Sequence, residues 1–266
     1  MRAFRRWHAP CIGRGRTARG RNLRGIHMDI SSAIALSSQF LLQRQTDAIA
    51  NNLANLATTA FKAQHRLFAE YLIQNSDGTT ASSVRETGTA RDMTQGPISQ
   101  TGNPLDVAIN GEGFFTIGTP LGPRYTRAGH FQIDASGQLV TSEGYAVLSE
   151  VNSPVQIADG GADISIGKDG TVTTGQGVAG RLQIVTFADL TALTGTAGGL
   201  YTTTQPTQPV PGTRLVQGAL EGSNVQPVIE LTRLMSVQRG NSYAKDFIDG
   251  EATRIQTAID HLGKVP

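Results

Sequence analysis

The distribution of glycine and proline divides this chain more sharply than any other feature of its sequence. Residues 28–75 contain neither residue, whereas residues 76–220 contain 23 glycines and eight prolines. Both residue types interrupt regular helix, glycine through its backbone freedom and proline because it lacks an amide hydrogen. The boundary near residue 75 therefore separates a segment suited to helix from one suited to turns and short strands.

The first part of the glycine-free segment is predicted to be an amphipathic helix. Its apolar residues recur mostly at helical spacing, which keeps them on one stripe: Ile30, Ile34, Leu41, Ile49, Leu53 and Leu56. Asp29 is a suitable N-cap because a short carboxylate can accept a hydrogen bond from a first-turn amide. We therefore expect the helix to extend from about Asp29 to about Leu56.

Three asparagines mark the predicted end of this helix. Asn51, Asn52 and Asn55 can compete with the helical backbone for hydrogen bonds, and such residues favour helix ends and turns. They predict that the chain turns over residues 58–61, although an ordinary helix end with a solvated polar side would also explain them. An apolar segment follows at residues 68–73, and its pattern decides for neither helix nor strand.

The middle of the chain is predicted to be a linker followed by antiparallel β structure. Residues 76–103 are polar and glycine-containing, and they favour a linker with little core of its own. From Leu105 the period changes to two, because Leu105, Val107 and Ile109 alternate with smaller or polar residues. This alternation is typical of a strand that is buried on one face.

Turn residues then recur along the middle of the chain. Asn110-Gly111 is typical of a tight turn, here into the apolar run 114–117, and residues 134–137 and 167–170 are typical of hairpin loops. A connector rich in glycine, threonine and proline occupies residues 194–213. Short strands separated in this way predict an antiparallel β domain, either sandwich-like or irregularly barrel-like.

The helical period returns near the C-terminus. Asn224 is a suitable N-cap, and Pro227 falls in the first turn, where its missing amide hydrogen costs nothing. Spacings of three and four residues then predict an apolar stripe that begins with Val228, Leu231 and Met235. A helix of about 35 residues would be roughly 50 Å long.

Helices at both ends with strands between them indicate the α+β class. Each terminal stripe is too sparse to enclose a core, so we expect the two terminal helices to pair as a coiled-coil-like segment, with the glycine-rich antiparallel β domain inserted. Side-by-side copies would bury the apolar surface that remains. The predicted organisation is a basic extension (1–27), an N-terminal helical segment (28–75), a linker (76–103), the β domain (104–215) and a C-terminal helical segment (216–266).

Composition and charge limit the classes of function that the chain can have. The chain is 38% hydrophobic and only 6% aromatic, which favours turn-rich β structure or surfaces that become buried on assembly. It contains no run of 18 apolar residues, so we expect no membrane span. Residues 1–27 hold eight arginines and no acid, so the overall net charge of +2 leaves −6 on residues 28–266. Nucleic-acid binding by this acidic main part is not expected.

The basic leader, residues 1–27, has several interpretations. It lacks a seven-residue apolar core, so it is not a secretory signal peptide, although its arginine-rich composition is similar to that of an organellar transit peptide. The interpretation we favour is that Met28 is the natural start; otherwise the leader is a solvated, disordered tail. The single cysteine, Cys11, also lies there, so residues 28–266 offer no disulfide or thiol chemistry.

The sequence offers little catalytic chemistry. It has no Gly-x4-Gly-Lys-Ser/Thr loop, no nucleophile elbow and no cysteine pair, and its five histidines lack metal-ligand spacing. We therefore predict no enzyme activity, no cofactor and no metal. Glu112 and Asp134 could form the carboxylate pair of a glycosidase, but turns favour the same residue types for structural reasons.

Four stretches together resemble one family. Residues 50–62 (Ala-Asn-Asn-Leu-Ala-Asn-Leu-Ala-Thr-Thr-Ala-Phe-Lys) are similar to the N-terminal signature of flagellar rod and hook proteins, with Ala60 where that family usually carries glycine. Residues 95–115 and 125–148 are similar to the entry to the family's middle domain and to its central hairpin region. Residues 216–225 resemble the signature before its last helix. The stretches follow the family's order, which makes the combination far more specific than any single motif.

The resemblance implies a structural subunit of the bacterial flagellar basal-body rod, and the modest middle domain favours the proximal-rod type. It also implies export through the flagellar type III apparatus without a cleaved signal, and polymerisation with copies and other rod subunits into a torque-transmitting shaft across the periplasm. The terminal helices would form the inner layer and the β domain the outer one. The predicted assembly residues are Asn51, Asn52, Leu53, Asn55, Phe61, Lys62, Leu220, Glu221, Asn224, Val225, Val228, Leu231 and Met235.

Other functions stay open at this point. Within the family, the alternative is a distal-rod or hook-type axial subunit. Outside it, a secreted β-rich binding module would not require helices at both termini and would act as a monomer with a tight small ligand. A cell-wall hydrolase would depend on Glu112.

Overall fold

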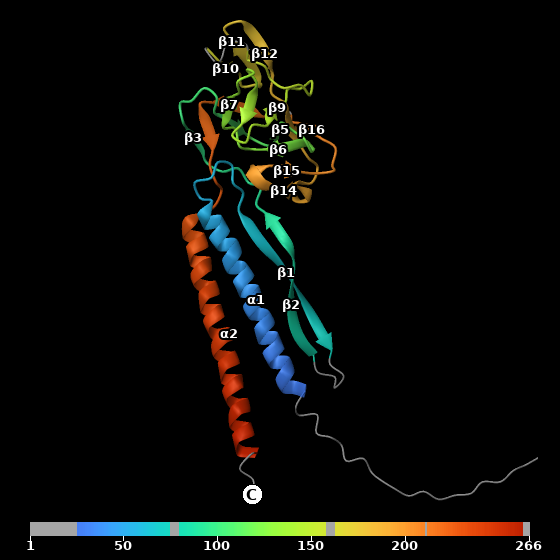
Figure 1. Ribbon diagram of the computed structural model, residues 1–266, viewed down its shortest axis with the longest axis vertical. Helices are drawn as coiled ribbons and strands as arrows, with labels where there is room; N and C mark the ends of the chain where they lie inside the picture. The colour runs from blue at the N-terminus through green and yellow to red at the C-terminus, as the bar shows by residue number, and fades with distance from the viewer. Residues whose placement is uncertain (1–25, 75–79, 158–162, 211, 263–266) are drawn as a thin grey trace, which may run out of the picture.

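The computed structural model describes residues 26–74, 80–157, 163–210 and 212–262. The molecule is elongated, with two long helices and a β hairpin at one end and a group of short strands at the other (Figure 1). We call the helices and hairpin the arm, and the strands of residues 98–221 the β region. The fold is α+β, as predicted; residues 1–25 of the predicted basic extension lie outside the described residues.

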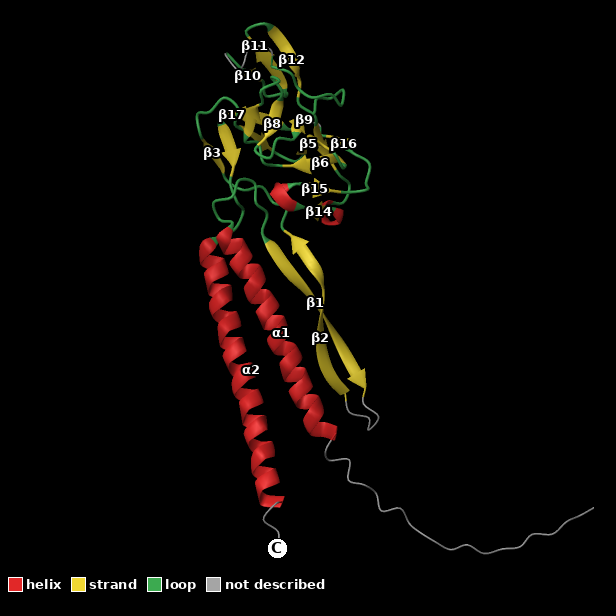
Figure 2. Ribbon diagram, viewed as in Figure 1, coloured by secondary structure: helices red, strands yellow, loops and turns green. Residues whose placement is uncertain are grey.

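The two helices are α1 (Ile26–Ala54) and α2 (Pro227–Leu262). They lie side by side (Figure 2), and the colours of Figure 1 show that they run in opposite directions. At Gly240 the helices come close, since an added Cβ would lie 3.3 Å from Leu42 Cδ2. The shielded residues of α2 alternate at spacings of four and three and form the stripe that faces α1: Glu230, Leu234, Val237, Asn241, Ala244, Ile248 and Glu251.

The arm also contains a long hairpin of β1 (Gln64–Gln74) and β2 (Thr80–Arg91). The strands pair antiparallel, with one register shift between Leu67 and Phe68. Both strands contact α1, which therefore lies between α2 and the hairpin (Figure 1). A two-stranded sheet is at best marginally stable alone, so packing on α1 supports it.

The remaining strands are short and belong to the β region. In chain order they are β3 (Ile98–Gln100), β4 (Val107–Asn110), β5 (Phe114–Thr119), β6 (Gly122–Thr126), β7 (Phe131–Ile133), β8 (Leu139–Thr141), β9 (Ala146–Val147), β10 (Ser165–Ile166), β11 (Thr171–Thr174), β12 (Gly177–Arg181), β13 (Ile184–Thr186), β14 (Thr194–Gly195), β15 (Tyr201–Thr202), β16 (Gln208–Pro209), β17 (Arg214–Gln217) and β18 (Ala219–Glu221). Two 3-10 turns, Leu190–Ala192 and Ala197–Gly199, lie between β13 and β15.

The β region has one large sheet and several small ones. The nine-stranded sheet contains the run β14-β15-β6-β5-β9-β8-β7, and β13 joins it by pairing with both β5 and β16. A second sheet has the order β10-β11-β12. Strand β17 pairs with β4 and strand β18 pairs with β3, and after β18 the chain continues into α2 of the arm. Fifteen buried apolar residues form the larger of two core clusters, in which the Phe115 and Phe131 rings meet edge to face at 5.2 Å.

The structure corrects both connecting segments predicted from composition. Most of residues 80–100, predicted as part of a linker at 76–103, belongs to β2 and β3, and the apolar segment 68–73 is strand. The connector predicted at 194–213 supplies β14, β15 and β16. The pattern hid these strands because the shielded positions of β2 include Glu86, Gly88 and Ala90, which are not large apolar residues, and because β14, β15 and β16 are only two residues long.

Both predicted hairpin loops are confirmed. Strands β7 and β8 pair across residues 134–137, and β10 and β11 pair across residues 167–170. The tight turn predicted at Asn110-Gly111 does not join a pair of strands, because β4 pairs with β17 and β5 pairs with β6. Gly111 and Gly113 have φ values of 121° and 118°, so the chain leaves the β4 ladder through glycine-only conformations instead of a two-residue turn.

The predicted helix caps are also wrong. Helix α1 begins at Ile26, upstream of the expected cap Asp29. Helix α2 begins at Pro227, in agreement with the prediction for that residue, but its first backbone bond runs from Glu230 N to Gln226 O at 3.1 Å. Asn224 therefore lies before the cap, where its side chain is used differently, as described below.

Candidate functional site: the polar junction

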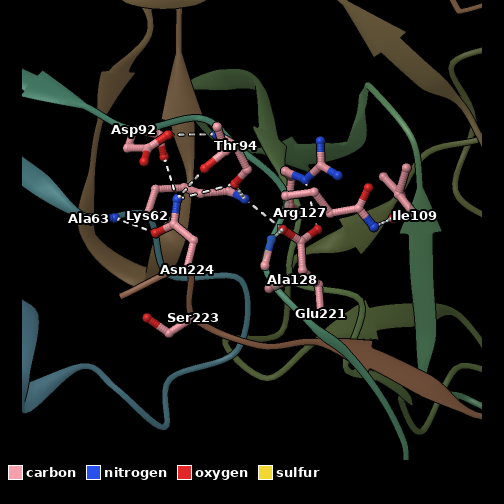
Figure 3. A network of polar contacts seen from close by, with 12 residues as sticks. Lys62, Ala63, Asp92, Thr94, Ile109, Arg127, Ala128, Glu221, Ser223 and Asn224 are labelled. Atoms are coloured by element: carbon pink, nitrogen blue, oxygen red, sulfur yellow. Dashed lines mark hydrogen bonds and ion pairs between the residues drawn. The ribbon is translucent and has the colours of Figure 1, made fainter. Parts of the chain in front are cut away.

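Three separate chain segments meet where the arm joins the β region. They are the turn after α1 (residues 55–63), the connection from β2 to β3 (residues 92–97) and the connection from β18 to α2 (residues 222–226). Backbone bonds join the turn after α1 to β18 and to the connection that follows it, from Ala60 N to Glu221 O at 2.8 Å and from Asn224 N to Phe61 O at 3.3 Å. We call this meeting point the polar junction (Figure 3).

Glu221, the last residue of β18, is the centre of the junction. Its carboxylate accepts from Lys62 Nζ at 2.6 Å and from Arg127 Nε at 2.8 Å. It also accepts from Gly96 N at 3.0 Å. The side chains of Lys62 and Glu221 are both 0% exposed. One carboxylate from the C-terminal part of the chain therefore binds a lysine from the turn after α1 and an arginine from the β region.

Carbonyl oxygens accept further hydrogen bonds from the two cations. Lys62 Nζ also donates to Thr94 O at 2.6 Å. The guanidinium of Arg127 donates to Gly111 O at 2.8 Å and Gly113 O at 3.2 Å, and it lies 5.8 Å from the Phe114 ring centre. Buried charges need such partners, because removing one of them leaves a charge without solvent or counter-ion.

The junction holds one more positive than negative charge in its Lys62–Glu221–Arg127 triad. Burial lowers the pKa of Lys62 below 10.5, and the nearby Arg127 also lowers it, whereas the bond to Glu221 acts in the opposite direction. The lysine is therefore the member of the triad whose charge is most costly to keep.

Asn224 is a bridge and not a helix cap. Its Oδ1 accepts from Ala63 N at 2.8 Å, and its Nδ2 donates to Asp92 O at 2.8 Å and to Thr94 O at 3.2 Å. The side chain thus satisfies the backbone on either side of the hairpin, at the start of β1 and the end of β2. One asparagine fixes the hairpin relative to the chain that enters α2.

Asn52 forms a second bridge inside the arm. It exchanges bonds with the backbone of Gln64, accepting from N at 2.9 Å and donating to O at 3.0 Å. Its Nδ2 also lies 3.3 Å from Glu230 Oε2, and Glu230 is paired with Arg233 at 2.6 Å. These bonds join α1, β1 and α2 at their common end, where Asn52 is fully buried.

The turn after α1 adopts the conformation that glycine usually takes. Ala60 has φ +55° and is buried, and a left-handed conformation costs a residue with a Cβ about 1–2 kcal/mol. Asn55 Nδ2 donates to Asn51 O at 2.8 Å, and Thr58 Oγ1 donates to Asn55 Oδ1 at 3.0 Å, so these side chains close the end of α1. The prediction of a turn here is confirmed.

The structure divides the thirteen predicted assembly residues into two groups. Those up to Val225 lie in or beside the polar junction; Asn52, Lys62, Glu221 and Val225 are buried there, and Asn51 is exposed. Leu53, Asn55, Phe61, Leu220 and Asn224 are partly buried.

The other group, on α2, is not where the sequence predicted. Val228, Leu231 and Met235 were expected to pair with the N-terminal helix, but they are 77%, 42% and 61% exposed. The stripe that faces α1 begins instead at Glu230 and continues through Leu234. The sequence misleads here because a buried Glu230 starts the stripe, and a charged residue is rarely assigned to a shielded position.

The sequence did not single out Arg127, Gly96 and Thr94 in the junction, or Glu230 as the partner of Asn52. Arg127 and Gly96 lie within stretches that carry the family resemblance, but nothing in their local pattern shows that they meet Glu221. A Cβ at Gly96 would overlap the Gly222 carbonyl oxygen, so only glycine fits this close crossing. Such contacts join residues that are far apart in sequence, and no periodicity reveals them.

Asp134, one of the two carboxylates considered for a glycosidase, has a structural role. Asp134 accepts from Ser136 N at 2.9 Å and Gln138 N at 2.8 Å, and these bonds, that from Gln138 first, lower the pKa of its carboxyl. A general acid needs the opposite shift. Among the described residues, no group of three or more histidine, cysteine or acidic side chains could hold a metal ion, and neither helix is long and apolar enough to cross a membrane.

An arm of paired helices and hairpin, held to a β region by a buried polar junction, defines an elongated structural protein. Comparison with known proteins agrees. Residues 108–174 match the family model "Flagellar hook protein FlgE/F/G D1 domain", and residues 216–240 match "Flagellar basal body rod FlgEFG protein C-terminal".

Named relatives extend the match to most of the chain. The flagellar basal-body rod protein FlgF of Caulobacter vibrioides is 38% identical over 244 residues, covering 90% of this chain and 100% of the relative. FlgF of Mesorhizobium japonicum is 32% identical, covering 89% and 99%, and FlgG of Bacillus subtilis is 35% identical, covering 74% and 86%. This chain therefore belongs to the family of flagellar basal-body rod proteins. It is a structural subunit of the basal-body rod, where it assembles with other rod subunits.

Proposed function

We propose that the chain polymerises, with copies of itself and with other rod subunits, into a proximal section of the axial shaft that transmits torque across the periplasm. The FlgF relatives match over 100% and 99% of their length, whereas the FlgG relative of Bacillus subtilis matches over 86%. This difference favours the proximal-rod type over the distal-rod type. Export through the flagellar type III apparatus, without a cleaved signal, is part of the same proposal.

The observation that carries this proposal is the exposed face of α2. We call Val228, Leu231 and Met235 the outer stripe; they lie three and four residues apart and therefore share one side of the helix. Burying a large apolar side chain contributes about 1.5–3 kcal/mol, so this stripe has a strong tendency to be covered. We propose that neighbouring subunits cover it, with the α1–α2 pair as a coiled-coil-like inner layer and the β region outside.

The junction residues have a different part in the proposal. Lys62 and Glu221 join the arm to the β region, and Asn224 joins the hairpin to the chain that enters α2, so a force on the helices reaches the β region through bonded atoms. The segments predicted from sequence, residues 28–75, 104–215 and 216–266, would then be units of assembly, and the junction would be the rigid joint between them.

A charged residue in the outer stripe tests the proposal. Met235→Asp in the full chain, expressed in a flagellated host that lacks its own copy, should prevent assembly because a carboxylate cannot be buried unpaired between subunits. The matched control is Leu121→Asp, since Leu121 is 84% exposed in the β region. Electron microscopy should show rods with the control and none with Met235→Asp, while circular dichroism of the purified chains should be alike. Normal rods and motility with Met235→Asp would contradict the proposal.

A helix-breaking change tests the inner layer. Leu234→Pro should abolish assembly because proline in the middle of α2 removes a backbone bond and clashes with the preceding turn. The purified variant should retain the tertiary signal of the β region. Leu234→Ala, which keeps the helix, should still assemble, and motility with Leu234→Pro would count against the proposal.

A further inference from the structure

Helix α2 carries a second exposed apolar face. Tyr243 and Phe247 are 72% and 49% exposed and lie four residues apart, so they share one side of the helix. We call them the aromatic face. The family resemblance did not single out either residue, and neither lies in the stripe that faces α1.

The aromatic face is not a continuation of the outer stripe. An α-helix advances about 100° per residue, which places the outer stripe roughly 130° to one side of the stripe that faces α1 and the aromatic face roughly 120° to the other side. Helix α2 therefore has three apolar faces, and in a single chain only one of them is covered. Apolar faces of a helix are normally covered, so both exposed faces favour contact with a partner.

The two exposed faces also lie at different heights along α2. The outer stripe is centred near Leu231 and the aromatic face near residue 245, which is a difference of about 20 Å at 1.5 Å per residue. Beyond Met235 the side of the outer stripe becomes polar, with Gln238, Ser242 and Asp246. On the side of the aromatic face, the residues before Tyr243 include the small Ser236 and Gly240. The other large apolar side chain on that side is Ile229, which is 43% exposed.

We infer that neighbouring copies of this chain contact each other through the outer stripe of one α2 and the aromatic face of the next, with the second copy shifted by about 20 Å along the helix axis. The inference rests on the proposed function, because copies in an axial shaft must run parallel. A contact of outer stripe with outer stripe would close a pair and leave every aromatic face exposed. The unlike contact covers both faces, and the shift makes the assembly helical and not a flat ring.

Crosslinking between separate copies tests the shift. Cys11→Ser removes the only native cysteine. In that background, full chains with Met235→Cys and with Phe247→Cys are co-expressed in a flagellated host, and isolated basal bodies receive a short bismaleimide. Neighbours in the shifted contact should give at least about tenfold more mixed dimer than the unshifted pair, Met235→Cys with Ser236→Cys, because proximity raises effective concentration. Leu231→Cys with Tyr243→Cys has the same 12-residue separation and serves if Phe247→Cys fails to assemble.

The possible outcomes separate this inference from the proposed function. Equal or stronger crosslinking of the unshifted pair would overturn the shift. Predominant dimers between two Met235→Cys chains would overturn the unlike contact in favour of a closed pair. Absence of the Cys11→Ser chain itself from isolated basal bodies would instead contradict the proposed function, before any crosslinker is added.

Discussion

The β region and the arm use apolar residues in opposite ways. In the β region the large apolar side chains are mostly enclosed, and Ile109, Phe115 and Leu139 are 0% exposed. In the arm, side chains of similar size stay open to solvent, with Phe40 at 64% and Leu72 at 70% exposure. The first pattern is that of a self-contained core, whereas the second is that of surfaces awaiting a partner.

This contrast shows that one chain can combine two sources of stability. The β region buries its core within the single chain, so its stability should not depend on concentration. The arm has one covered stripe and several open faces, so neighbouring subunits should supply most of its stability. The polar junction lies between them and lets stabilisation of one reach the other.

The change with the largest expected effect removes the centre of the junction. Glu221→Ala leaves Lys62 and Arg127 buried without their counter-ion, and such losses cost about 3–5 kcal/mol. Chemical denaturation of the purified chain should show this loss. The control is Glu150→Ala, because the Glu150–Arg181 pair is about half exposed and should change stability by less than about 1 kcal/mol. Equal effects from the two changes would show that the junction is not a stabilising element.

The contrast itself is tested by truncating one leucine on each side. Leu139→Ala in the enclosed core should destabilise the purified chain by about 2–5 kcal/mol. Leu231→Ala, at a side chain 42% exposed, should cost less than about 1 kcal/mol in the same denaturation experiment, yet it should reduce rod assembly. If Leu231→Ala destabilised the single chain as much as Leu139→Ala, the arm would be as self-contained as the β region.

A smaller effect is expected from pH. The folded-state pKa of Lys62 is lowered below 10.5, so between these two values the unfolded chain holds a proton that the folded chain has released. Stability should therefore rise with pH across this window, be complete above pH 10.5, and fall as the pH drops through the folded-state pKa. Denaturation midpoints of the wild type relative to Lys62→Met should show this slope. A difference that stays constant from pH 7 to 10.5 would contradict it.

The smallest predicted effect concerns the turn after α1. Ala60 is held at φ +55°, so Ala60→Gly relieves a cost of about 1–2 kcal/mol, although the loss of a buried methyl group offsets part of it. We expect a net gain of up to about 1 kcal/mol in thermal or chemical denaturation. Ala63→Gly, at a buried alanine outside this left-handed turn, should destabilise instead and serves as the control.

Local pattern predicted the two terminal helices and two of the turns. The helical period of residues 227–262, Pro227 in the first turn of α2 and the loops at 134–137 and 167–170 are local features, and the structure contains them. The family resemblance also directed attention to Lys62, Glu221 and Asn224. In these cases the physical cause lies within a few residues of the pattern.

Pairing between distant segments could not be predicted in this way. The partners of Glu221 lie 159 and 94 residues away in sequence, at Lys62 and Arg127. The sequence pattern did not identify β1 as a strand and predicted a linker for β2. Each strand is stabilised by hydrogen bonds to the other and by packing on α1, and neither contact is visible in the local pattern. The α1-facing stripe of α2 was misplaced because it includes Glu230 and Asn241, whose burial depends on the partner helix.

Amide hydrogen exchange tests the central claim most directly, namely that the β region is complete in one chain and the arm is completed by its neighbours. The exchange of the purified chain is compared with that of the chain in isolated rods. We predict that β5 and β8 amides are strongly protected in both, whereas the exposed half of α2 around Tyr243 becomes protected only in rods. Equal protection of α2 and β5 in the purified chain, with no gain in rods, would contradict the claim.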